Sequence, residues 1–217
     1  EVIQAANQDY PRSRIPLPSP GVGGYCLTKD PFILLHSTKN IPAHPYIVFH
    51  ARKVNAMMPQ HVVSKTLRFL KEVAKKKPMQ SRVAILGLAY KGYPETTDMR
   101  YSPSLDVIRL FQESKVNLVV HDHVIEKIEP EKIRSLAVPS AKNIQAAFKG
   151  TDAVILMINH KRYAKRDILE MVDTMKKPGL FLDPWQLHSA DDVVKREVHY
   201  SNLGYDTFLD IKEEVVT

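Results

Sequence analysis

The sequence contains a single cysteine, Cys26, among its 217 residues. One thiol cannot form a disulfide within the chain or a cysteine-rich metal site, so we expect no metal centre and a reducing, cytoplasmic setting. No run of about 18 apolar residues is present, and we therefore expect no membrane-spanning helix. The first residues, 1–11, lack the basic stretch and apolar core of a signal peptide.

Other features are also missing. The chain does not begin with methionine, and residues 1–7 have a helical pattern, so we expect it to be part of a longer protein. It has no internal repeat and no low-complexity tract. Only eight glycines are present, and none belongs to the GxGxxG fingerprint of a dinucleotide-binding loop.

The net charge of +7 is unevenly distributed. Residues 1–80 carry 12 Lys or Arg against 4 Asp or Glu, whereas residues 81–217 carry 19 against 20. A positive field favours anionic partners such as nucleotide sugars, dinucleotides or nucleic acid. Nucleic acid is the least favoured, because the chain has no recognised binding motif and its basic residues lack interleaved aromatic residues.

The first third of the chain has a helical pattern. Prolines make residues 8–24 an extended loop, and a short helix is expected over 30–37. Apolar residues then recur at three- and four-residue steps from 46 to 76, which predicts one long amphipathic helix that Pro59 kinks or splits. Its apolar stripe needs a partner, either a second subunit or the rest of its own chain.

After Pro78 the pattern changes to alternating strands and helices, which is typical of a parallel sheet with crossover helices. We expect strands at 82–86, 116–120, 153–158 and 180–182, and helices at 103–114, 141–148 and 167–175. The predicted domains are therefore 1–78, which is helical, and 79–217, which is α/β. The last eight residues are expected to form a frayed tail.

The chemistry is concentrated in residues 19–31, SPGVGGYCLTKDP. Gly21, Gly23 and Gly24 let backbone N–H groups approach a ligand closely. If a helix starts near residue 27, Cys26 and Asp30 lie on one side of its first turn. A thiol beside a helix N-terminus and a lysine is expected to have a lowered pKa, which favours the nucleophilic thiolate. A lone cysteine is more often a small buried side chain, and that alternative stays open on this pattern alone.

A second candidate site is the long loop after the first strand, residues 87–101. It carries Tyr90, whose ring can stack on a base, and Lys91 and Arg100, which can meet phosphates. Loops at the carboxyl ends of parallel strands are where ligands bind in α/β sheets. The alternative for each of them, a solvent-exposed loop side chain without a role in binding, stays open.

The two stretches GVGGYCLTKDP and GLAYKGYPETTDMRYSP resemble the two signatures of the UDP-glucose/GDP-mannose dehydrogenase family. The segment before the cysteine is most similar to the branch that acts on UDP-N-acetylhexosamines, the UDP-N-acetylmannosamine dehydrogenases in particular. The resemblance implies an α/β protein with a helical dimerisation segment, built on a long central helix, followed by a Rossmann-like UDP-binding domain. The family's N-terminal NAD-binding domain would precede Glu1.

The resemblance also implies roles for single residues. Cys26 matches the catalytic thiol and Asp30 the aspartate that assists hydrolysis. Tyr90 and Lys91 match a pair that contacts the UDP-sugar. Two arginines complete the implied site: Arg100 matches one that reaches NAD, and Arg12 matches one that contacts substrate in the neighbouring subunit of a homodimer or larger homo-oligomer. The glycine loop, Gly21 to Gly24, would contact substrate through its backbone.

The family oxidises the sugar C6 alcohol to a carboxylate in two NAD-dependent steps, with a cysteine thiohemiacetal and a thioester on the way. This chain departs from the family pattern at Tyr25 and Thr28, and at Trp185, where an arginine that touches substrate is usual. We expect the chain alone to bind UDP weakly and not to turn over. The alternative is a non-catalytic UDP-sugar-binding or scaffold module that keeps the fold.

Overall fold

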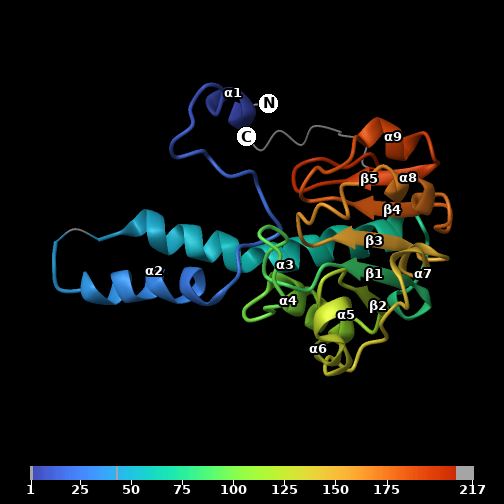
Figure 1. Ribbon diagram of the computed structural model, residues 1–217, viewed down its shortest axis with the longest axis horizontal. Coiled ribbons are helices and arrows are strands. Elements are labelled where there is room, and N and C mark those ends of the chain that lie inside the picture. The colour runs from blue at the N-terminus through green and yellow to red at the C-terminus, as the bar shows by residue number, and fades with distance from the viewer. Residues whose placement is uncertain (1, 43, 209–217) are drawn as a thin grey trace.

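Five parallel strands form a single sheet in the order β2–β1–β3–β4–β5 (Figure 1). The computed structural model describes residues 2–42 and 44–208. The strands are β1 (Arg82–Leu86), β2 (Asn117–His121), β3 (Ala153–Leu156), β4 (Gly179–Leu182) and β5 (Val198–Ser201). Strand order reverses between β1 and β3, and such a switch point is where open α/β sheets bind ligands at their carboxyl edge.

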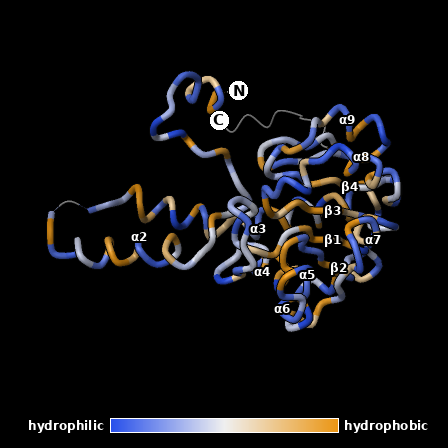
Figure 2. Tube along the Cα trace, in the orientation of Figure 1, coloured by the Kyte–Doolittle hydropathy of each residue, from blue (hydrophilic) through white to orange (hydrophobic). Residues whose placement is uncertain are grey.

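Helices cover both faces of this sheet because alternate strand residues point to opposite sides. Val83 and Ile85 pack with one set of helices, and Ala84 and Leu86 pack with the other. The first set is α3 (Tyr46–Glu72), α4 (Pro103–Glu113), α5 (Ile125–Ile128) and α6 (Pro130–Arg134). The second set is α7 (Ile144–Phe148), α8 (Asp167–Val172) and α9 (Ala190–Val194). The strands appear as hydrophobic stretches at the centre of the domain (Figure 2).

A helical arm projects from the carboxyl side of the sheet (Figure 1). It consists of α2 (Tyr25–Ser37) and the first half of α3, and we call residues 25–58 the arm. No residue of α2 is buried, and the buried residues of α3 begin only at Pro59. The short α1 (Val2–Ala6) and the following loop extend beside the arm and have no buried residue before Pro20.

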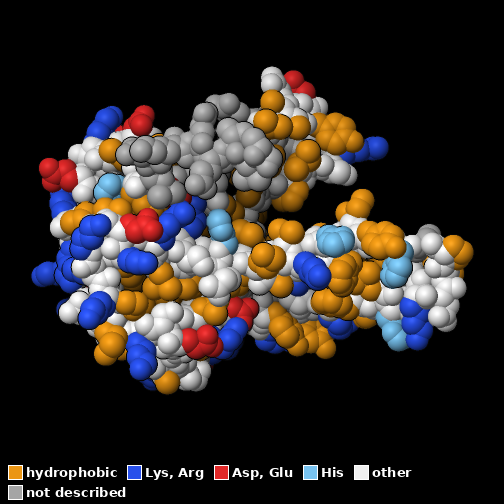
Figure 3. Space-filling view, turned by 180° about the vertical axis from the view of Figure 1, so that it is seen from behind, with side chains coloured by type: hydrophobic (Ala, Val, Ile, Leu, Met, Phe, Trp, Pro, Cys, Tyr) orange, Lys and Arg blue, Asp and Glu red, His pale blue; other side chains and the backbone are white. Residues whose placement is uncertain are grey.

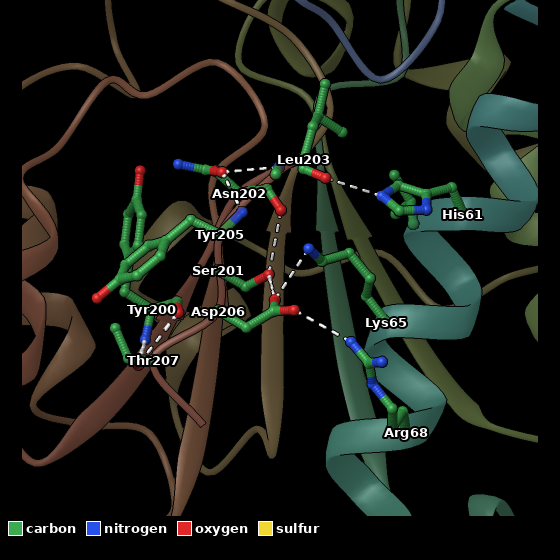
Figure 4. Close-up of polar contacts among 12 residues, drawn as sticks. His61, Lys65, Arg68, Tyr200, Ser201, Asn202, Leu203, Tyr205, Asp206 and Thr207 are labelled. Atoms are coloured by element: carbon green, nitrogen blue, oxygen red, sulfur yellow. Dashed lines mark hydrogen bonds and ion pairs between the residues drawn. The ribbon is translucent and has the colours of Figure 1, made fainter. Parts of the chain in front are cut away.

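The second half of α3 is fixed to the sheet by buried polar contacts (Figure 4). The carboxylate of Asp206, in the loop after β5, accepts from Lys65 at 3.0 Å and from Arg68 at 3.1 Å. The Ser201 hydroxyl also donates to Asp206, and His61 Nε2 lies 2.9 Å from the Leu203 carbonyl oxygen. These contacts hold the root of the arm above the carboxyl edge of β5.

The structure confirms the parallel α/β sheet and the long helix, and corrects several details. α3 runs through Pro59 as one helix and ends at Glu72, so it is not split. α2 begins at Tyr25, earlier than expected, with Pro31 inside it. The sequence pattern missed β5, α5, α6 and α9, and the expected frayed tail, residues 210–217, lies outside the described residues. Among the described residues no helix combines the length and hydropathy needed to cross a bilayer.

Candidate functional site

The cysteine lies at the start of α2. Gly24 precedes the helix with a φ of 89°, a conformation that side chains other than glycine rarely adopt. Cys26 is therefore in the first turn of α2, where backbone N–H groups lack helical partners and favour negative charge. The Cys26 side chain is exposed. The alternative of a buried structural cysteine is thus excluded, and Asp30 lies one turn further along the same helix.

The glycine loop before Cys26 is fixed to α3 by one side chain. The Asn55 Oδ1 accepts the Val22 N–H at 2.7 Å, and its Nδ2 donates to the Val22 carbonyl at 3.1 Å. These two hydrogen bonds resemble those between neighbouring strands, and they fix the glycine loop to the arm at Asn55. Asn55 was not predicted from the sequence, although its place beside the apolar stripe of α3 was a usable signal.

The two predicted motifs meet through the glycines of this loop. A Cβ on Gly24 would lie 2.9 Å from two ring carbons of Tyr90, and one on Gly23 would lie 2.3 Å from the Tyr101 carbonyl oxygen. Gly21 packs against Pro103 in the same way, with 3.0 Å to its ring. The glycines are therefore required by close contact with the loop after β1, which brings Cys26 and Tyr90 to one site.

Cations and aromatic rings surround this junction. The Tyr25 ring lies between Lys29 Nζ, 5.4 Å from its centroid, and the Arg100 guanidinium, at 5.7 Å. Lys91 Nζ lies 5.3 Å from the centroid of the Tyr90 ring. Such cation–π contacts are each worth about 0.5–1 kcal/mol at exposed positions. Tyr25, which replaces the histidine usual in the resembled motif, thus links the cysteine helix to the 87–101 loop.

Carboxylates orient two of these cations. Arg100 forms a two-pronged pair with Asp98, with Nη2 to Oδ2 at 2.7 Å, and this hydrogen bonding lowers the pKa of Asp98. Lys29 Nζ lies 3.1 Å from Asp30. The pKa of Lys29 is raised, chiefly by its hydrogen bond to Asp30 and less by Tyr25 and Cys26. The Lys29–Asp30 pair thus lies one helical turn from the thiol.

A pocket of about 340 Å³ adjoins the junction on the side of α3 and gives a ligand room. Val22, Lys29 and Tyr101 line it from the two motifs, and Arg52 lines it from α3. The Arg52 Nε is buried and has no hydrogen-bond partner among the described residues. Among those residues, no group of three or more His, Cys, Asp or Glu side chains is arranged to hold a metal ion.

The described part of the sheet lacks the features by which Rossmann folds usually bind a dinucleotide. In such sites a carboxylate at the end of β2 binds a ribose. Here that position is Asp122, which is fully buried and accepts four backbone N–H groups. They belong to Leu88, Ala89, Val124 and Ile125, at 2.7 to 3.3 Å. With no GxGxxG loop and no free carboxylate, the residues present do not fit NAD in this domain, and Asp122 instead fixes the 87–101 loop to β2.

The predicted Arg12, and Trp185, which departs from the family pattern, lie outside these two segments. Arg12 is exposed in the loop between α1 and α2. Trp185 lies after β4, and its indole Nε1 is buried with no hydrogen-bond partner among the described residues. The other predicted residues, Gly21, Gly23, Gly24, Cys26, Asp30, Tyr90, Lys91 and Arg100, belong to the two segments that the structure brings together.

Comparison with known families accounts for both segments. Residues 1–57 match the central domain of the UDP-glucose/GDP-mannose dehydrogenase family, and residues 84–190 match its UDP-binding domain. The chain belongs to this family. Its helical arm and cysteine loop are thus the family's central domain, and its parallel sheet is the Rossmann-like UDP-binding domain.

Individual relatives agree with this assignment. The chain is 31% identical over 163 residues to a UDP-N-acetyl-D-mannosamine dehydrogenase of Pyrococcus horikoshii, and 32% identical over 164 residues to one of Campylobacter jejuni. These matches cover 75% of this chain but 34% and 37% of the relatives. The chain therefore spans little more than a third of the length of these enzymes.

Solved structures show the same fold. The UDP-D-ManNAc dehydrogenase of P. horikoshii superposes with a TM-score of 0.72 and 26% identity, over 94% of this chain and 43% of that one. An NDP-N-acetyl-D-galactosaminuronic acid dehydrogenase from Methanosarcina mazei gives 0.74 and 25%, over 88% and 40%. The arrangement of arm and sheet is thus the one found in nucleotide-sugar dehydrogenases.

Proposed function

We propose that this chain is the substrate-binding and thiol-bearing part of an NAD-dependent UDP-sugar dehydrogenase that produces a uronate. UDP-N-acetylmannosamine is the substrate we favour, because relatives named for it match 75% of this chain. The observation that supports this most is the contact of Gly24 with the Tyr90 ring. It places the exposed thiol of Cys26 beside the loop that carries Tyr90 and Lys91.

Cys26 is the nucleophile in this proposal. Its exposed sulfur, in the first turn of α2, adds as the thiolate to the aldehyde carbon at C6 and forms a thiohemiacetal. The aldehyde oxygen takes up a proton as the C–S bond forms. Capture as a tetrahedral adduct holds the aldehyde in place, and C6 keeps the aldehyde hydrogen that the second oxidation would remove as hydride.

Asp30 acts in the last step. Water attacks the carbonyl of the thioester, and Asp30 accepts a proton from that water as the C–S bond breaks. The thiolate of Cys26 is then restored and the carboxylate product is free. Asp30 suits this role because its exposed carboxylate pairs with Lys29 at 3.1 Å, and because it lies one helical turn from Cys26.

Lys91, Tyr90 and the glycine backbone hold the UDP-sugar in this proposal. Lys91 meets a phosphate or a sugar oxygen, and the Tyr90 ring covers one side of the ligand. NAD supplies hydride acceptance in this family, and Arg100 is the one residue we assign to it in this chain. Because the α/β sheet itself does not fit NAD, we expect the chain alone to bind UDP-sugar and to produce no NADH.

We also propose that the protein works as a homodimer or larger homo-oligomer in the cytoplasm, with a domain boundary near residue 78. Arg12, which lies in an exposed loop, then reaches the site of the second copy. The exposed hydrophobic side chains of the arm support this arrangement, because a second copy would cover them.

The test is alkylation of Cys26. Iodoacetamide should label the chain at neutral pH, and UDP-N-acetylmannosamine should slow the labelling, because the sugar covers the thiol. Lys91→Ala should weaken this protection, and Lys53→Ala, on the exposed face of α3, serves as the control. Labelling that the UDP-sugar leaves unchanged would favour the non-catalytic scaffold instead.

A further inference from the structure

The loops that follow β1 and β3 touch backbone to backbone. A Cβ on Gly92 would lie 2.4 Å from the His160 backbone nitrogen, and one on Gly87 would lie 2.3 Å from the Ile158 side chain. Both contacts lie at the carboxyl ends of β1 and β3, where the strand order reverses. The two loops are thus in close contact at the point where such sheets usually receive a nucleotide.

Polar contacts hold the two loops in this position. The Gly92 N–H donates to Asn159 Oδ1 at 3.2 Å. His160 is 1% exposed, and its Nδ1 accepts the Arg162 N–H at 3.1 Å. Because Nδ1 accepts, Nε2 is the nitrogen that donates to Glu95 Oε1, at 3.1 Å.

Glu95 is suited to accept from this ring. Lys161 also reaches it, at 3.0 Å, and the hydrogen bonds from Lys161 and His160 lower the pKa of Glu95. The 87–101 loop is thus tied to the β3 loop at two points, Gly92 and Glu95. Tyr90 and Lys91 come just before the first of these ties, and the Tyr90 ring contacts the cysteine loop at Gly24.

We propose that Asn159 and His160 are positioning residues that hold the Tyr90–Lys91 turn out of the sheet crevice and against the cysteine loop. The nucleotide then lies between these two loops and not in the crevice between β1 and β3. The identity of that nucleotide as UDP rests on the proposed function. The contacts of Asn159 and His160 with the 87–101 loop, which we call the clamp, do not rest on it.

The first test is amide hydrogen exchange in the 87–101 loop of the whole 217-residue chain. Asn159→Ala should speed exchange in this loop roughly tenfold, the factor expected for one lost hydrogen bond, with the melting temperature little changed. Asn159→Asp keeps an acceptor for Gly92 and should keep exchange slow. His123→Ala is the matched control, because its ring lies 5.5 Å from His160 but bonds to nothing in the loop.

The second test uses UDP as the probe. UDP should protect amides of residues 21–24 and 89–92, and Asn159→Ala should bind it several-fold more weakly. Protection at 158–163 instead would overturn the proposed placement of the nucleotide. Unchanged loop exchange in Asn159→Ala would overturn the clamp. A wild-type chain that binds no UDP would overturn the proposed function and the placement, while exchange alone still decides the clamp.

Discussion

Single glycines decide whether the two motifs can meet. Gly24 combines a positive φ with a distance of 2.9 Å from its would-be Cβ to the Tyr90 ring. A side chain here must displace that ring or twist the start of α2. The glycine pattern is therefore a consequence of contact between two distant segments, and not only of a turn.

We expect Gly24→Ala to lower the free energy of unfolding by about 1–3 kcal/mol, the usual cost of overpacking at a strained position. Urea denaturation measures it. The rate of Cys26 alkylation should change in the same variant, because the first turn of α2 shifts. Gly204→Ala is the control, since a Cβ there meets nothing within 4 Å; equal costs for the two variants would contradict this account.

A buried carboxyl after β4 makes stability depend on pH. Burial raises the pKa of Asp183 from its usual 3.8 to about 6, and its Oδ1 has no hydrogen-bond partner among the described residues. The folded state thus binds this proton more tightly than the unfolded state. Protonated Asp183 makes its full contribution to the free energy of unfolding below pH 3.8. As pH rises to about 6, this contribution of about 3 kcal/mol is lost.

Asp183→Asn should remove this loss, because the amide stays neutral and its oxygen can still accept the His188 N–H. The variant should gain stability relative to wild type between pH 4 and 6, and the gain should then level off. His121, whose pKa burial lowers to about 4, acts in the opposite direction over this range, so the difference between the two proteins is the quantity to measure. A difference that is flat with pH would refute the assignment.

At the scale of whole elements, α3 is the part that joins arm and sheet. Its buried half depends on the pair of Lys65 and Asp206, whose side chains are 6% and 7% exposed. Removing one partner of a buried pair is costly because the other charge remains desolvated.

Lys65→Met should therefore lower the free energy of unfolding by about 3 kcal/mol, somewhat reduced because Arg68 and Ser201 still reach Asp206. Lys53→Met, on the exposed half of the same helix, should cost less than about 0.5 kcal/mol. Urea denaturation of the two variants provides the comparison, and similar costs would show that the network does not fix α3.

The elements found from sequence and those missed differ in length and in apolar content. β1 and β3 are unbroken apolar runs, and the start of α4 carries Ser102 as a cap before Pro103, so all three were predicted. β5 is VHYS, a strand of four residues that includes two polar ones, and only its pairing with β4 makes it a strand. The missed helices have four or five residues, too short for helical periodicity to appear.

The candidate site was predictable only in part. Glycines, cysteine and the Tyr90–Lys91 pair could be recognised in the sequence as two separate motifs. Their contact could not, because it depends on how α3 carries the cysteine loop over the carboxyl edge of the sheet. The roles of Asn55 and Asn159 were hidden for the same reason: each bonds to the backbone of a segment far away in the sequence.

At the scale of the whole molecule, the arm is the part whose hydrophobic side chains stay exposed to solvent in the single chain. Hydrophobic side chains gather along it in Figure 3, with histidines among them. Ile47 is 85% exposed, and Val54 and Met57 are exposed on the same helix. An apolar groove of about 550 Å³ also opens between α2 and α3 near the tip. Monomeric proteins rarely expose contiguous apolar surface on this scale.

We therefore expect the arm to bury this surface against a second copy. Ile47→Glu combined with Val54→Glu should shift the protein from dimer towards monomer in sedimentation velocity, because each buried carboxylate would lack a partner. The melting temperature of the α/β domain should stay the same at low concentration, since neither residue belongs to its core. Met79→Glu, an equally drastic change at an exposed residue beside β1, should leave the dimer intact. A wild-type chain that sediments as a monomer at tens of micromolar, or a double variant that still dimerises, would show that the arm is covered in some other way.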